Sequence, residues 1–339
     1  MVLTTECFVA RCVTTDEAVA PDCFGFRDVD VPELPPNGLL IKTKFIGLEP
    51  YMRIWGIGPQ GWGLDNVMDR VPGGKVVGEV VASESERFAV GDLVKTSAQW
   101  RAPVTWVVAD EKTLVEKLDP TVEPRIYLGL AGSGGRSAKL PLERVARPSA
   151  GQVAVVTAAA GTVGLAACQL MKLDGVDVVG TAGTDEKKRL IESLGCKAFN
   201  YKTEAAADAL KRLAPKGVDF LFDNVAGAIR TAVVEAMNPG AQILTSGRIA
   251  QYDAAGGAAG GDEARDAAMI REKKIADHGQ FYVGNWESEF VPCTEAIVAL
   301  YKAGKLVSKD TVSEGFRSLP DAFVGIFLGR NVGRMVVAC

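Results

Sequence analysis

The stretch that decides the fold spans residues 153–172 and reads VAVVTAAAGTVGLAACQLMK. It opens with a β-branched run, passes through a turn that contains Gly161 and Gly164, and continues with apolar residues at helical spacing. A buried strand, a tight turn and a helix are predicted, in the order of a dinucleotide-binding βαβ unit. In such a unit Gly161 would let the backbone approach a pyrophosphate, and Gly164 would let the helix lie close to the strand.

The turn departs from the common fingerprint G-x-G-x-x-G because Ala159 stands at the position of the first glycine. On the pattern alone, an ordinary tight turn between a strand and a helix remains an alternative. The β-branched strand before the turn and the apolar helix after it favour the dinucleotide site, since the fingerprint carries weight only in that context.

Further apolar β runs follow downstream, separated by stretches of helical length, at 176–181, 220–224 and 243–247. This alternation predicts a parallel sheet covered by helices, and hence a doubly wound α/β domain. The first third of the chain differs, because proline and glycine interrupt its short apolar runs at 39–46, 75–82 and 105–109. That punctuation predicts an irregular antiparallel β domain.

The residues after the second strand bear on the type of nucleotide. An NAD site usually sets a carboxylate there against the ribose 2′-hydroxyl, but this strand ends in Thr181-Ala182-Gly183-Thr184. Lys187 and Tyr201 follow and could converge on a 2′-phosphate, which favours NADP. The alternative is that residues 185–188 form a solvated first helical turn capped by Thr184.

Two later segments have their own character. Residues 253–266 read DAAGGAAGGDEARD, a composition that predicts a mobile loop or the frayed start of a helix. Near the C-terminus, residues 320–328 predict a helix and residues 334–338 predict a last strand.

The composition excludes several classes of protein. The chain has 339 residues, 47% hydrophobic and 24% charged, which predicts about two ordered domains rather than a disordered chain. A formal net charge of -4 offers no basic face, so nucleic acid is not expected as a partner. Seven cysteines without regular spacing are typical of a reducing compartment, and a cytoplasmic location is expected.

Neither a membrane segment nor a metal site is expected. Residues 1–12 contain Glu6 and lack the basic start of a secretory signal. The uncharged residues 148–171 contain glycines and polar residues, so a buried strand, turn and helix explain them better than a membrane span. The single histidine, His278, and scattered cysteines without a C-x-x-C pair cannot supply the ligands of a zinc site.

Seven short motifs occur along the chain in a fixed order. They are Glu49-Pro50-Tyr51-Met52-Arg53, the 158–164 turn, Gly183-Thr184-Asp185-Glu186-Lys187, Phe199-Asn200-Tyr201-Lys202, Asp223-Asn224-Val225-Ala226-Gly227, Gln251-Tyr252-Asp253 and Gly329-Arg330-Asn331-Val332-Gly333. In this order the motifs resemble the medium-chain dehydrogenase/reductase superfamily. Within it they are similar to the zinc-independent branch of prostaglandin reductases, leukotriene hydroxydehydrogenase and plant alkenal double-bond reductases.

The resemblance implies an α/β protein with a GroES-like β catalytic domain and a Rossmann cofactor domain with a doubly wound parallel sheet. The expected boundaries are 1–125 for the catalytic domain, 126–302 for the NADPH-binding domain and 303–339 for a C-terminal segment that rejoins the catalytic domain. By the same carry-over, Lys187 and Tyr201 would hold the 2′-phosphate of NADPH. The other expected cofactor contacts are Ala160, Gly161, Thr162, Val163, Gly164, Gly183, Asn224, Tyr252 and Asn331.

The activity that the resemblance implies is reduction of the carbon–carbon double bond of an α,β-unsaturated aldehyde or ketone, by hydride transfer from NADPH to the β-carbon. Tyr51 and Tyr252 are the hydroxyls expected to contact the carbonyl oxygen or deliver a proton. Alternatively, these two tyrosines only pack the cleft floor and a ribose, and water protonates the α-carbon. Arg53 and Tyr282 are further candidates for substrate contact. A quinone reductase and a catalytically silent NADPH-binding protein remain alternatives.

Two departures from the family pattern concern the substrate. Gly284 stands where the family often has a tyrosine, and Tyr282 is the hydroxyl nearby. Where the family commonly has Gly-Leu-Thr-Ala-Tyr, this chain has Gly135-Arg136-Ser137-Ala138-Lys139, whose two basic residues would favour an anionic substrate or face solvent. A homodimer through the cofactor domain is also expected, with residues 280–283 as an edge strand that pairs across a two-fold axis.

Overall fold

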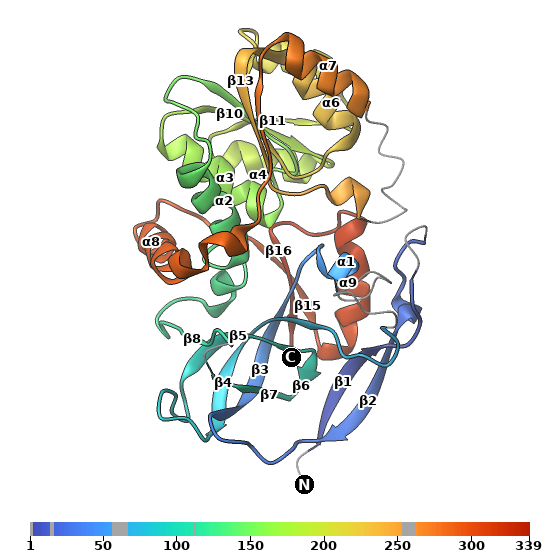
Figure 1. The fold of residues 1–339 in the computed structure, drawn as a ribbon, viewed down its shortest axis with the longest axis vertical. Coiled ribbons are helices and arrows are strands. Elements are labelled where there is room, and N and C mark those ends of the chain that lie inside the picture. Colours follow the sequence, from blue (N-terminus) through green and yellow to red (C-terminus); the bar gives the residue numbers. More distant parts are fainter. Residues whose placement is uncertain (1–2, 14–16, 56–66, 111–112, 253–261) are drawn as a thin grey trace. The chain divides into compact units, whose positions relative to one another are not determined.

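The computed structural model describes residues 3–13, 17–55, 67–110, 113–252 and 262–339 (Figure 1). These residues pack as two units. The first unit is formed by the described residues of Met1–Gly129 and Asp310–Cys339, together with Tyr252. The second is formed by Leu130–Gln251 and the chain from residue 262 to Lys309. The C-terminal residues therefore return to the unit in which the chain begins.

The second unit is built on a parallel six-stranded sheet with the order β11-β10-β9-β12-β13-β14. The order reverses between β9 and β12, as in a doubly wound Rossmann sheet. Val155, Val179 and Leu221 are fully buried within it, in keeping with helices on both faces. The strands are β9 (Val153–Val156), β10 (Asp177–Ala182), β11 (Lys197–Asn200), β12 (Val218–Asp223), β13 (Met237–Thr245) and β14 (Ala276–Gln280).

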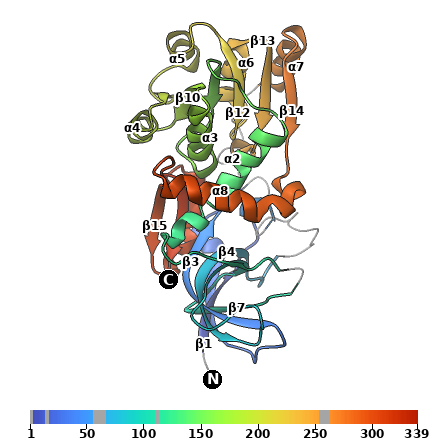
Figure 2. The same cartoon turned by 90° about the vertical axis from the view of Figure 1, so that its left-hand side faces the viewer.

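Helices cover both faces of this sheet (Figure 2). Gly180 of β10 faces Ile191 of α4, whereas its neighbour Val179 belongs to a core cluster with residues of α5 and α6, because successive strand residues point to opposite faces. None of the helices in the described part of the chain has the length and apolar character that crossing a membrane requires. The helical elements are α2 (Ser133–Arg144), α3 (Thr162–Leu173), α4 (Asp185–Ser193), α5 (Ala206–Leu213), α6 (Gly227–Ala236), η4 (Ile249–Gln251), α7 (Glu263–Glu272), η5 (Val283–Glu289) and α8 (Phe290–Lys302).

The first unit is mainly antiparallel. Strands β15-β16-β3-β4-β5-β8 run in order, β7 pairs with β3 to complete a seven-stranded sheet, and β2-β1-β6 form a smaller one. Only β15 and β16 pair in parallel among its described strands. The buried residues Leu39, Ile41 and Val80 pack with Phe88 and Val94 in one core cluster.

The strands of the first unit are β1 (Leu3–Val9), β2 (Phe24–Asp30), β3 (Gly38–Leu48), β4 (Gly73–Ser83), β5 (Leu93–Gln99), β6 (Arg101–Ala102), β7 (Val104–Val108), β8 (Glu116–Lys117), β15 (Asp310–Glu314) and β16 (Arg334–Ala338). Its helical elements are η1 (Pro21–Cys23), α1 (Met52–Trp55), η3 (Pro124–Tyr127), η6 (Phe316–Ser318) and α9 (Leu319–Phe327). The predicted fold class is confirmed, since a β unit accompanies a Rossmann-type parallel sheet.

Two local predictions need correction or restriction. The strand predicted at 280–283 is wrong, because β14 ends at Gln280 and the Phe281 ring then packs against Trp286, with 6.1 Å between ring centroids. The exposed edge strand is Ala276–Gln280 instead. Within the predicted loop 253–266, residues 253–261 lie outside the described residues, and α7 begins at Glu263.

Candidate active site

The loop between β9 and α3 forms a tight turn at the carboxyl end of the parallel sheet. Ala158 has a φ of 47°, and its carbonyl oxygen accepts a hydrogen bond from the Gly161 N–H at 2.9 Å. A Cβ atom on Gly164 would lie 2.3 Å from that same oxygen, so only glycine lets α3 start this close to the strand. Gly161 is the N-cap and carries no capping side chain. The first N–H groups of α3 cannot be satisfied within the helix and therefore suit an anion.

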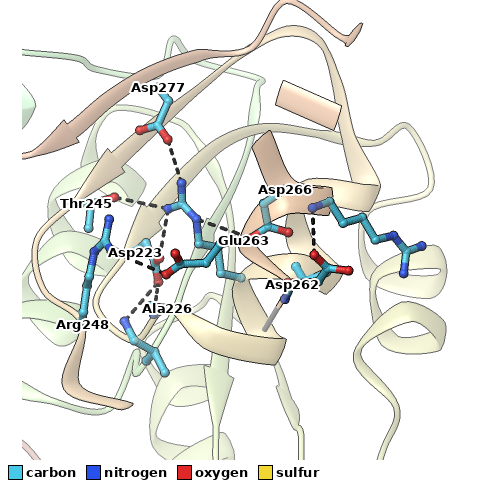
Figure 3. A network of polar contacts seen from close by, with 12 residues as sticks. Asp223, Ala226, Thr245, Arg248, Asp262, Glu263, Asp266 and Asp277 are labelled. Carbon is cyan, nitrogen blue, oxygen red and sulfur yellow. Dashed lines mark hydrogen bonds and ion pairs between the residues drawn. The ribbon is translucent and has the colours of Figure 1, made fainter. Parts of the chain in front are cut away.

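Polar groups at the carboxyl ends of β9 and β12 are bonded to one another where the strand order reverses. Thr157 Oγ1 donates to Asp223 Oδ1 at 2.8 Å. The Asn224 N–H donates to Thr157 Oγ1 at 2.7 Å, and Asn224 Nδ2 donates to the Thr157 carbonyl oxygen at 2.8 Å. Asp223 is fully buried and also accepts from the Ala226 N–H at 3.2 Å (Figure 3). These bonds orient Asn224 at the strand ends, where ligands of doubly wound sheets bind.

Gly183 and Tyr201 meet at the same edge of the sheet. The pairing of β10 with β11 aligns Ala182 with Asn200, and the residues that follow them are therefore neighbours. A Cβ atom on Gly183 would lie 2.8 Å from the Tyr201 phenol oxygen and 3.5 Å from Lys202 Cε. A glycine at this position thus leaves the space that the phenol occupies. Partial burial raises the pKa of Tyr201, which keeps the phenol neutral and able to donate at pH 7.

Lys187 adds a second cation to this cluster. Burial first, and the positive charge of Lys202 second, lower the pKa of Lys187. Thr184 caps α4 by accepting a hydrogen bond from the Lys187 N–H at 3.3 Å, so the positive end of the helix dipole lies here too. A phosphate would stabilise the two ammonium groups beside a phenol and a helix N-terminus.

Of the two acidic residues of this turn, Asp185 is held by the neighbouring strand, whereas the charge of Glu186 acts on Lys187. Asp185 accepts a hydrogen bond from Asn200 Nδ2 at 2.8 Å. Lys188 pairs with Glu192 at 2.7 Å, and both Lys187 and Lys188 are partly buried, so the alternative of a solvated first turn describes the exposed Asp185 and Glu186 better than either lysine. Lys202 was not among the predicted cofactor contacts. Aligning the ends of the second and third predicted strands would have placed it beside Gly183.

Tyr51 lies in the first unit, in the turn between β3 and α1, and 40% of its surface is exposed. The neighbouring Glu49 is buried and pairs with Arg334 at 2.7 Å. Arg334 Nη1 also donates to the Leu48 carbonyl oxygen at 3.1 Å. A buried ion pair therefore fixes the base of the turn that presents the Tyr51 phenol.

Asn331 lies at the same end of the first unit's sheet as Tyr51. The loop that carries it precedes β16, and β16 runs antiparallel to β3 with Met335 opposite Leu48. Asn331 Nδ2 donates to the Gly333 carbonyl oxygen at 2.8 Å, which shapes the loop. Its contact with the cofactor stays a prediction.

The other two candidates of the first unit differ in exposure. Arg53 is buried, and its guanidinium donates to the Glu17 carbonyl oxygen at 2.9 Å, so it supports the chain around α1. Tyr252 is half-buried and packs with the first unit, directly after η4. Substrate contact by Arg53 and the catalytic role of Tyr252 both stay predictions.

Tyr282 lies in the second unit, after β14, and is 72% exposed. Its ring occupies the space beside Gly284, because a Cβ atom on Gly284 would lie 2.4 Å from Tyr282 Cε1. The Phe281 N–H donates to the Thr245 carbonyl oxygen at 3.2 Å, so this segment passes the carboxyl end of β13. The phenol of Tyr282 thus covers the position at which the family often has a tyrosine.

Arg136 and Lys139 do not simply face solvent, one of the two roles considered for them from the sequence; that they favour an anionic substrate stays a prediction. Arg136 is buried, with its Nε 2.9 Å from Thr294 Oγ1 and its guanidinium 4.7 Å from the Phe290 ring centroid. Both partners lie on α8, which packs on α2. Lys139 forms an ion pair with Glu143, one turn further along α2. Arg136 therefore joins two helices, and neither charge is left facing solvent alone.

In the part of the chain that the structure describes, no three His, Cys, Asp or Glu side chains are placed to hold a metal ion. His278 is exposed on β14, and its Nε2 lies 3.1 Å from Gln242 Oε1. Metal independence stays a prediction that chelation and elemental analysis can test.

Comparison with known proteins finds similarity over nearly the whole chain. Residues 13–116 match a family described as the N-terminal domain of oxidoreductase, and residues 162–275 match one described as zinc-binding dehydrogenase. The chain is 32% identical to the 2-alkenal reductase (NADP(+)-dependent) of Nicotiana tabacum, covering 91% of this chain and 88% of that protein. It is 31% identical to prostaglandin reductase 1 of Sus scrofa, covering 94% of each. The solved structure of CurA in complex with NADPH from Vibrio vulnificus has a TM-score of 0.86 at 28% identity, covering 98% of each chain.

The second matched stretch, 162–275, contains no histidine, so its match reflects the shared cofactor fold of the wider superfamily. The similarity to the two reductases spans both units. The chain belongs to the zinc-independent branch of the medium-chain dehydrogenase/reductase superfamily, the branch of the 2-alkenal reductases and prostaglandin reductases.

Proposed function

We propose that the protein uses NADPH to reduce the carbon–carbon double bond of α,β-unsaturated aldehydes or ketones. The observation that carries the cofactor is the cluster of Gly183, Lys187, Tyr201 and Lys202 beside the α4 N-terminus. Its two cations and phenol suit a 2′-phosphate, the group that distinguishes NADPH from NADH. The reaction is supported by the relatives named as reductases of alkenals and prostaglandins.

When bound, NADPH supplies the hydride that the β-carbon receives. The turn from Ala160 to Gly164 would accept the pyrophosphate, and Asn224 and Asn331 would contact other parts of the cofactor. Tyr51 and Tyr252 are the hydroxyls that we assign to the carbonyl oxygen, where negative charge develops as the β-carbon is reduced. A neutral phenol donates a hydrogen bond to that oxygen, and the α-carbon then takes its proton from a phenol or from water.

The test measures oxidation of NADPH over a panel of enals, enones and quinones, with the products identified by mass spectrometry. NADPH that carries deuterium at the transferred position should yield a saturated carbonyl compound with deuterium at the β-carbon. Reduction of quinones alone would favour a quinone reductase. Binding of NADPH without its oxidation across the panel would favour a catalytically silent member of the fold.

The same assay separates the tyrosines. Tyr51→Phe and Tyr252→Phe should each lower enone turnover more than they weaken NADPH binding, because both remove a hydroxyl assigned to the substrate oxygen. Tyr301→Phe, in α8, is the matched control and should change neither quantity. Wild-type turnover in both of the first two variants would leave water as the proton source. Arg53 and Tyr282 remain proposed substrate contacts and can be tested in the same way.

We also infer a homodimer that forms through the second unit. β14 is an edge strand of the six-stranded sheet, and each of its residues is exposed, so its backbone can pair with another strand. Pairing of β14 with its copy across a two-fold axis would continue the sheet. Light scattering that finds a monomer at micromolar concentration would contradict this assembly. The compartment that we propose is the cytoplasm, since all seven cysteines, each within the described residues, are free thiols.

A further inference from the structure

Arg230, in the first turn of α6, brings three carboxylates together in the second unit. These carboxylates, Asp223, Asp266 and Asp277, are labelled in Figure 3. Its guanidinium lies 3.2 Å from Asp223, 2.7 Å from Asp277 and 3.8 Å from Asp266. These acids come from β12, β14 and α7. Arg230 Nη1 also donates to Thr245 Oγ1 at 3.3 Å, at the end of β13. One side chain therefore joins three adjacent strands to the helix that precedes β14.

The cluster holds more negative than positive charge and has little access to water. The Asp223 side chain is 0% exposed, and those of Asp266 and Arg230 are 7% and 13% exposed. Burial raises the pKa of Asp266, and the charge of Arg230 opposes that rise. Stability alone is a poor explanation for such a cluster, since well-packed apolar residues often stabilise a protein as much as a buried ion pair does.

The two oxygens of Asp223 connect Arg230 to the residue that follows β9. Oδ2 accepts from Arg230, and Oδ1 accepts from Thr157 Oγ1 at 2.8 Å. Thr157 Oγ1 in turn accepts from the Asn224 N–H at 2.7 Å. Thr157 directly precedes Ala158, the residue with a φ of 47° that opens the tight turn before α3. The orientation of the Asp223 carboxylate thus affects the chain at the ends of both β9 and β12.

We infer that Arg230 is a positioning residue for the dinucleotide, because it holds Asp223 in the orientation that sets Thr157 and Asn224 at the ends of β9 and β12. The inference rests on the proposed use of NADPH and is independent of the substrate. Without the guanidinium, Asp223 would be a buried carboxylate without its charge partner, and it would have to take up a proton or turn away. Either change alters the bonds to Thr157 and Asn224. None of these bonds involves the cluster around Gly183 and Lys187.

The test measures the dissociation constants of NADPH and NADH for the full chain in the absence of substrate. Arg230→Met should weaken both cofactors by the same factor, about tenfold or more, because a buried charge loses its partner. The ratio of the two constants should keep its wild-type value, whereas Lys187→Ala should change that ratio. Arg230→Lys retains the charge and should recover part of the loss. The matched control is Arg212→Met, which removes an exposed arginine of α5 that lies 2.7 Å from Glu204. It should change neither the NADPH nor the NADH dissociation constant.

Thr157→Val tests the other end of the same chain of bonds, and it keeps the inference testable if Arg230→Met does not fold. It should weaken both cofactors, and the losses in log Kd of Thr157→Val and Arg230→Lys should be less than additive when combined. Unchanged constants in a folded Arg230→Met, a changed NADPH-to-NADH ratio, or additive losses would each overturn the inference. A wild-type chain that binds neither cofactor would refute it together with the NADPH assignment. Normal cofactor binding without enone reduction would count against the proposed reaction alone.

Discussion

Replacing Arg334 with methionine should destabilise the first unit and displace the turn that carries Tyr51. Arg334 and Glu49 lie 2.7 Å apart, and their side chains are only 5% and 7% exposed. Removal of one partner leaves the other as an uncompensated buried charge, for which the typical cost is about 3–5 kcal/mol. The lost hydrogen bond to the Leu48 carbonyl falls within that range. The free energy of unfolding should therefore fall by about 3–5 kcal/mol.

Urea unfolding followed by tryptophan fluorescence suits this measurement. Trp100 is fully buried in the first unit, and Trp286 is the one tryptophan of the sequence that falls in the second. Two probes are needed because a chain of two units can unfold in more than one step, so far-UV circular dichroism should accompany the fluorescence. The double variant Glu49→Gln/Arg334→Met should lose less stability than the sum of its single variants, since it leaves no buried charge without a partner.

The matched control is Lys95→Met, which breaks the buried Lys95–Glu116 pair of the same unit, with 2.8 Å between the charged atoms and exposures of 3% and 9%. It should cost similar stability, because the burial and geometry are alike. Only Arg334→Met should lower enone turnover at unchanged NADPH affinity, since only that pair adjoins the Tyr51 turn. A stability loss below about 1 kcal/mol, as an exposed ion pair would give, would refute the energetic argument. Equal turnover in the two variants would refute the link to Tyr51.

Three further predictions address the cofactor, the pH dependence and the substrate. Lys187→Ala should weaken NADPH by about 1–3 kcal/mol and leave NADH nearly unchanged, with Lys188→Ala as control; equal losses for both cofactors in a titration would contradict the assignment. Burial raises the pKa of Asp310 to about 6, so the folded state binds a proton at this carboxyl group more tightly than the unfolded state does. The stability gained from that proton is lost as pH rises from about 4 to 6. Asp310→Asn should therefore be the more stable chain at pH 7, by at most about 3 kcal/mol, and identical urea midpoints at pH 4 and pH 7 in both chains would disprove it. Gly284→Ala should displace the Tyr282 ring and change the KM for enones at constant NADPH affinity; an unchanged KM would remove Tyr282 from the substrate site.

Much of the second unit could be predicted from local pattern. The β-branched run before Gly161, the apolar helix after Gly164 and the missing acid after Thr181 depend on neighbours in the sequence, and the strand and helix they predict are present. The prediction at 280–283 was wrong because the strand ends at Gln280 and the Phe281 ring packs on Trp286. A period of two over so few residues cannot separate a strand from such a segment.

Contacts between residues far apart in the sequence could not be predicted in this way. No residue near Arg136 in the sequence predicts its burial against Thr294. Its charge predicted exposure or an anionic ligand instead. Lys202 joins the cluster of Gly183, Lys187 and Tyr201 only because parallel pairing sets Asn200 opposite Ala182. A pattern within one segment does not specify strand register, which depends on the turns and on the faces that are buried.

The sequence by itself determined the alternation of strands and helices and the tight turn at Gly164, because steric freedom and periodicity are properties of short segments. The residues after Thr181 favoured NADPH only together with the family resemblance, since a solvated helical turn explained them as well. Only the tertiary structure decided that Arg334 would neutralise Glu49 and that Arg230 would join Asp223 to Asp277. A buried charge requires a partner of opposite charge, and many residues of the chain could be that partner. The topology of the sheet decides which of them lies next to the buried charge.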